Sequence, residues 1–223
     1  MNDNDEVSLA NFLFPDVESD TDLAQSLGSV ADSHKACRLQ WIESEDSQDV
    51  LLRVHNDRIQ VTYTPLTAAS IPYELKQPEE LVRMCRQLFR SFEPQESMTA
   101  VLPSLQLSKR LYLNLKRCTG AVTWNQLAAR LSASSGDYEF SGEMAKVMKS
   151  CSMEGEIRLC TRSKSGWQYD YAAFIGHHAS IWLLRMSVKA NEDWLVAVPL
   201  SRGQLCAIIT EWALHPAEVP NTE

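Results

Sequence analysis

Histidine and cysteine are the residues of this chain whose chemistry could support metal binding or nucleophilic catalysis. None of the five histidines lies three or four residues from another on a predicted helix, the spacing that presents two ligands to one metal ion. His177 and His178 follow Gly176 in a predicted turn, where adjacent side chains point to opposite faces. The histidines therefore predict no metal site.

A cysteine nucleophile is one hypothesis for catalysis. Cys160 and His177 could approach one another across neighbouring predicted strands, and an imidazole beside a thiol can activate it. Against this, Cys85, Cys151 and Cys206 fall on the apolar faces of predicted helices, as expected of small buried hydrophobes with a raised pKa. The chain also lacks the common motifs for a serine nucleophile, a phosphate loop or a zinc-binding helix. We expect no catalytic residue, no metal and no cofactor.

A row of aromatic side chains is the positive signal for binding. Trp167, Tyr169 and Tyr171 alternate along one predicted strand and so share one face. Tryptophan and tyrosine offer large contact areas and dominate binding hot spots, although aromatic residues in strands also pack under helices. The row is therefore the predicted binding face for another protein.

Composition predicts a protein that remains in the cytoplasm. The 223 residues are 44% hydrophobic, which is enough for a contiguous core. No apolar run approaches the roughly 18 to 20 residues that span a membrane, and the N-terminal residues are acidic rather than basic. The six cysteines form no Cys-x-x-Cys pair, which favours reduced thiols.

The net charge of −8 is concentrated at the start of the chain. Residues 1–33 contain eight acidic residues and no Lys or Arg, so the remainder has equal numbers of acidic and basic residues. A nucleic-acid-binding protein would be expected to show a basic stripe, so no nucleic acid partner is expected. Residues 1–33 are predicted to be a disordered acidic tail, with the alternative that Phe12, Leu13 and Phe14 form a short docking segment.

Hydrophobic periodicity predicts an α+β fold with antiparallel sheets and packed helices. Residues 34–223 are expected to form one domain, with two pseudo-repeated halves at about 34–118 and 119–223 that share a strand, proline, helix pattern. Pro199 is expected to end the last strand. The predicted strands are 38–42, 50–54, 58–63, 156–161, 167–174, 179–188 and 194–198, with 98–116 also favouring strand; the predicted helices are 78–92, 124–131, 141–151 and 204–214.

The second half of the sequence resembles a known family. Residues 121–214 resemble the EspG-like family of ESX (type VII) secretion. The resemblance is carried by a helix at 143–151, strands at 156–159, 171–176 and 180–185, and then Pro199 followed by an apolar helix. These are cytosolic chaperones. The resemblance implies a pseudo-two-fold α/β fold without catalytic residues, which recognises the exposed end of a helical secretion substrate and keeps it soluble.

The leading hypothesis is a non-catalytic cytosolic chaperone or adaptor that binds a partner protein through a sheet face and the terminal helix. Three alternatives stay open. One is an immunity-type inhibitor of a basic toxin. The second is a small thiol-dependent enzyme using Cys160 with His177. The third is a homo-oligomer in which the aromatic row is the self-interface.

Overall fold

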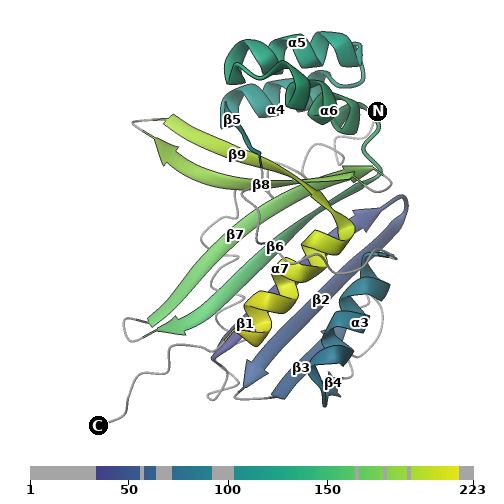
Figure 1. Cartoon of the computed structure of the whole chain (residues 1–223), viewed down its shortest axis with the longest axis vertical. Coiled ribbons are helices and arrows are strands. Elements are labelled where there is room, and N and C mark those ends of the chain that lie inside the picture. The colour runs from purple at the N-terminus through teal and green to yellow at the C-terminus, as the bar shows by residue number, and fades with distance from the viewer. Residues whose placement is uncertain are drawn as a thin grey trace, which may run out of the picture.

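The computed structural model describes residues 34–55, 58–63, 72–91, 103–163, 166–177, 180–189 and 192–215. Nine antiparallel strands form one sheet in the order β4-β3-β2-β1-β6-β7-β8-β9-β5, which confirms the α+β class (Figure 1). The strands are β1 (Lys35–Glu43), β2 (Asp46–His55), β3 (Arg58–Tyr63), β4 (Pro72–Leu75), β5 (Leu105–Ser108), β6 (Met153–Ser163), β7 (Gly166–His177), β8 (Ser180–Lys189) and β9 (Glu192–Ser201). The helices are α3 (Pro78–Leu88), α4 (Lys109–Cys118), α5 (Trp124–Ser135), α6 (Tyr138–Lys149) and α7 (Arg202–Leu214).

The centre of the sheet is a long-range pair. β1 lies antiparallel to β6, with Leu39 opposite Ile157, so two segments far apart in sequence are neighbours. The sheet extends in both directions from this pair. On one side β1 to β4 follow one another and lead into α3, and on the other side β6 to β9 follow one another and lead into α7. One continuous sheet therefore contains both predicted halves, and the division near residue 118 stays a prediction.

Local sequence signals begin and end the helices. Thr123 is the N-cap of α5, as the sequence predicts, and forms a capping box with Gln126. Ser201 and Gln204 form the same reciprocal box at the start of α7. Gly136 ends α5 with a φ of 78°, a left-handed conformation that glycine adopts without strain. These caps fix where α5 begins and ends and where α7 begins.

The two faces of the sheet carry separate cores. On the α3/α7 face, the helices α3 and α7 pack side by side, and Trp41 stacks on Phe89 with ring centroids 5.1 Å apart (Figure 1). On the opposite face, named the α4–α6 face, α4, α5 and α6 pack on β5 and the adjoining strands around Trp182. Leu183 belongs to the first core and Leu184 to the second, as strand alternation requires.

Three sequence expectations are corrected. Pro199 lies inside β9, opposite Trp182 on β8. This is tolerated because β5 begins at Leu105, opposite Ala197, so no described strand on that side of β9 requires an amide hydrogen from the proline. The strand prediction for 98–116 holds at 105–108 and is wrong from Lys109, where Ser108 caps α4. The first predicted helix ends at Leu88. Phe92, His178 and the acidic segment 1–33 lie outside the described residues.

Candidate functional site

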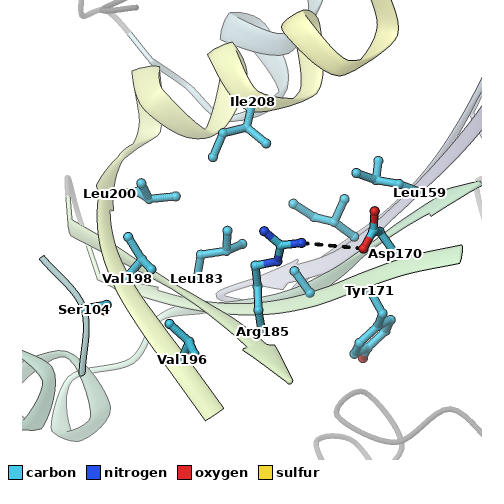
Figure 2. Close-up of a pocket in the computed structure, with 12 residues that line it drawn as sticks. Ser104, Leu159, Asp170, Tyr171, Leu183, Arg185, Val196, Val198, Leu200 and Ile208 are labelled. Atoms are coloured by element: carbon cyan, nitrogen blue, oxygen red, sulfur yellow. Dashed lines mark ion pairs between the residues drawn. The ribbon is translucent and has the colours of Figure 1, made fainter. Parts of the chain in front are cut away.

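An apolar groove lies on the α3/α7 face between the sheet and α7 (Figure 2). Its volume is about 420 Å³, within the range of ligand-binding pockets. Four strands, β6 to β9, form its floor, and Ile208 of α7 forms one wall. The apolar side chains of the lining include Ile157, Leu159, Leu183, Val198, Leu200 and Ile208.

The groove exists because α7 covers only part of its sheet face. Leu205, Ile209 and Ala213 of α7 are buried in the core against the sheet. Ile208 and Val198 are only partly buried at the edge of that core. Figure 1 shows α7 over the middle of the sheet and α3 beside it near β3 and β4, with β8 and β9 extending beyond both helices. Apolar strand residues beyond α7 therefore line a surface instead of a closed core.

One ion pair marks the polar end of the groove. Arg185 on β8 points toward Asp170 on β7, with Nη2 and Oδ1 3.5 Å apart (Figure 2). The two side chains are 58% and 72% exposed, so the pair adds little to stability. It gives an otherwise apolar groove one orienting polar feature, which suits a ligand with apolar side chains and a polar end.

The predicted aromatic row lies on the opposite side of the sheet from the groove. Tyr171 is one of the residues that line the groove, but Figure 2 shows its ring on the far side of the strands from Ile208. Trp167 is half-buried against Cys160 and Ala36, whereas Tyr169 is 45% exposed. The row therefore occupies the part of the α4–α6 face beyond those helices, and its role in binding a partner stays a prediction.

The groove itself was missed by sequence reasoning. A signal was present in residues 194–198, which are apolar at every position instead of at alternate ones. Such a strand is expected to contact apolar surface on both faces. The sequence did not show that one of those faces extends beyond its covering helix.

A buried carboxylate lies beside the aromatic row. Glu156 is 1% exposed, and its Oε1 lies 2.9 Å from Arg158 Nε. The Tyr171 hydroxyl donates to its Oε2 at 3.0 Å. Burial raises the pKa of Glu156, although Arg158 and Tyr171 act in the opposite direction. Tyr171 thus has a structural partner as well as a place in the predicted binding row.

The raised pKa of Glu156 predicts a pH-dependent stability. Between its unfolded pKa of about 4.5 and the higher folded value, the folded state holds more protons, so the free energy of unfolding falls as pH rises. Glu156→Gln removes this titration while keeping the side-chain shape. Urea unfolding gives the free energy of unfolding of the wild type minus that of Glu156→Gln. We expect this difference to be smaller or more negative at about pH 7 than at about pH 4.5. An equal difference at both pH values would contradict this.

The thiol hypothesis is not supported by the geometry. Cys160 lies opposite Tyr169, whereas His177 is the last residue of β7, eight positions further along. At 3.3 Å per residue the two are roughly 26 Å apart, so they cannot act together. Burial raises the pKa of Cys85 and of Cys206 to about 12, and it also raises the pKa of Cys37. These thiols are poor nucleophiles at neutral pH.

The described part of the chain contains neither a metal-ligand cluster nor a membrane-spanning helix. No three His, Cys, Asp or Glu side chains there are grouped so that they could hold a metal ion. None of the described helices has the length and apolar character needed to cross a membrane.

Comparison with known proteins identifies the fold. No protein-family model matches the chain, and no curated protein matches it by sequence. Among solved structures, the chain is similar to the Mycobacterium tuberculosis type VII secretion system chaperone EspG5, solved in complex with a PE25-PPE41 dimer. The TM-score is 0.50 at 8% sequence identity, covering 91% of this chain and 79% of that chain. At this identity the similarity shows the fold alone, and it extends the EspG-like resemblance of residues 121–214 to most of the chain at the level of architecture.

Proposed function

We propose that this protein is a non-catalytic, cytoplasmic chaperone or adaptor that binds an apolar helical segment of another protein in the groove beside α7. The observation that carries this proposal is the groove itself: an apolar surface formed by a sheet face and the terminal helix. The finer proposal is that the partner is a helical substrate of type VII secretion. Its support is the fold shared with a chaperone that was solved in complex with a protein dimer.

The dimensions of the groove limit what it can hold. A volume of about 420 Å³ accommodates a few side chains but not a whole helix. A helical partner presents apolar side chains at i, i+3 and i+4 along one face, and such anchors can enter a shallow groove while the helix axis stays outside. Asp170 and Arg185 at one end would orient the segment through its polar groups. A helix end with two or three apolar anchors fits these requirements.

The first experiment is capture of the tagged full chain from its native cells, followed by titration of the purified partner by calorimetry. The test variant is Val198→Glu with Ile208→Glu, two partly buried groove positions that tolerate a charge better than the core does. We expect the dissociation constant to rise by about 100-fold, because two apolar anchors lose their contacts. The matched control is Ile42→Glu, which places the same charge at a residue that is 40% exposed and outside the groove.

The aromatic row is tested in the same titration with Trp167→Ala and Tyr169→Ala combined. Loss of binding in this variant and not in the groove variant would move the site to the α4–α6 face. Unchanged binding in both would overturn the proposal. Sedimentation of the free protein tests the homo-oligomer hypothesis. Recovery of a basic toxin in place of a helical substrate would favour the inhibitor hypothesis.

A further inference from the structure

The part of the α4–α6 face beyond those helices gathers arginine side chains from strands that are distant in sequence. Strand alternation and the register of β1, β2, β3 and β6 place five arginines on it. We name this surface the arginine face. Its arginines are Arg38, Arg53, Arg58, Arg158 and Arg162.

The aromatic row borders the arginine face. On β7, Trp167 lies opposite Arg162 and Tyr171 lies opposite Arg158. The Arg158 guanidinium lies 5.9 Å from the centre of the Tyr171 ring, close enough for a cation–π contact. Arginine and aromatic side chains therefore form one continuous surface with both charge and contact area.

Three carboxylates lie among these arginines. Arg38 and Arg158 are directly opposite on neighbouring strands, an arrangement that repels unless acids lie nearby. Asp49 accepts from Arg38 at 2.8 and 3.1 Å, and Glu156 pairs with Arg158. A third carboxylate, Glu74, lies 3.7 Å from Arg58. The described part of this face thus carries five arginines and three carboxylates, which leaves it net positive.

The acidic leader, residues 1–33, joins the chain at the edge of this same face. His34 is held between the two neighbouring strands, because its amide donates to the Val54 carbonyl at 3.0 Å and its carbonyl accepts from the Arg162 amide at 2.8 Å. Its ring stacks on His55, with the ring centroids 5.9 Å apart. The leader has eight acidic residues and no basic one, so its charge is opposite to that of the arginine face.

We propose that the arginine face binds the acidic leader of its own chain. Arg162 is next to His34 across the strands, and Arg38 is four residues along β1, roughly 14 Å away. The chain from Asp32 back to Asp16 can extend up to roughly 50 Å, which is long enough for its acidic residues to reach Arg58 and Arg162, the exposed arginines of the face. A tethered segment also has a high effective concentration and loses no translational freedom on binding.

Single-stranded nucleic acid is the chemical rival, since it also binds arginine and aromatic surfaces. The net charge of −8 weighs against it, because a tethered polyanion competes for the same arginines. An oligonucleotide that binds the full chain equally well with and without the leader's charges would overturn the intramolecular assignment.

Proteolysis of the full chain tests the proposal. The leader offers chymotrypsin Phe12 and Leu13, so its cleavage can be followed by mass spectrometry. We expect the leader to be cleaved about 10-fold more slowly at about 0.01 M salt than at about 1 M, where the screening length falls to about 3 Å. A synthetic peptide of residues 1–33, digested in parallel, corrects for the effect of salt on the protease.

Two variants should remove the protection at low salt. One neutralises the leader with Asp16→Asn, Glu18→Gln, Asp20→Asn and Asp22→Asn, and the other carries Arg53→Gln with Arg162→Gln. The matched control, Arg83→Gln with Arg130→Gln, removes two exposed arginines of α3 and α5 and should keep the protection. Combining Arg53→Glu and Arg162→Glu with Asp20→Lys and Asp22→Lys should restore it, a result that misfolding cannot produce.

Three outcomes would overturn the proposal. The first is a cleavage rate that, relative to the peptide, does not depend on salt. The second is protection that survives in both neutralised variants. The third is protection that disappears on dilution, which would assign the leader to a second copy of the chain instead of its own.

Discussion

Gly155→Ala is expected to lower the free energy of unfolding by about 3 kcal/mol or more. A β-carbon at this position would lie 2.3 Å from the Gln40 carbonyl oxygen, 2.4 Å from Trp41 Cβ and 2.6 Å from Phe174 Cζ. The first of these is a backbone atom of β1 next to Trp41, the residue opposite Gly155 in the central β1–β6 pair, so it cannot move without separating the two strands. Urea unfolding followed by circular dichroism measures the change.

Gly142→Ala is the matched control. It adds the same methyl group inside α6, where nothing lies within 4 Å of the added carbon. Because alanine loses less backbone entropy than glycine on helix formation, this variant should be more stable by up to about 1 kcal/mol. Opposite signs for the two variants are the expected result, whereas equal effects would show that close packing at Gly155 does not limit the approach of β1 and β6.

The local elements could be predicted from sequence, but the central strand pair could not. The alternation in residues 50–54 and 58–63, the N-cap at Thr123 and the helix start at Pro78 depend on nearby residues only. The pairing of Leu39 with Ile157 joins strands separated by more than a hundred residues, and no local pattern specifies it. The predicted succession of neighbouring strands is correct for β6 to β9.

The candidate surfaces differ in how much the sequence could reveal. Strand alternation alone places Trp167, Tyr169 and Tyr171 on one face. The arginine face was hidden because Arg38 and Arg158 are distant in sequence, and the equal count of charges after residue 33 suggested an even distribution. The groove depends on where α7 stops covering the sheet, which is set by tertiary packing.

Arg202 holds the groove-forming helix in place. It is the first residue of α7, and its Nη2 lies 2.7 Å from Glu43 Oε1 at the end of β1. Its Nη1 donates to the Phe89 carbonyl at 2.8 Å, where α3 ends. One guanidinium therefore connects both helices of the α3/α7 face to the central strand, and it is 9% exposed.

Arg202→Met is expected to lower the free energy of unfolding by about 3 kcal/mol, because it leaves the Glu43 carboxylate and the Phe89 carbonyl largely buried without this donor. Adding Glu43→Gln should recover part of the loss, since the group left without the guanidinium is then uncharged. A double-mutant cycle measures this coupling between Arg202 and Glu43. Arg83→Met on the exposed side of α3 should change stability by less than about 0.5 kcal/mol. Because α7 forms one wall of the groove, Arg202→Met should also weaken partner binding under conditions where the variant is folded. Unchanged affinity under those conditions would show that the groove does not depend on Arg202.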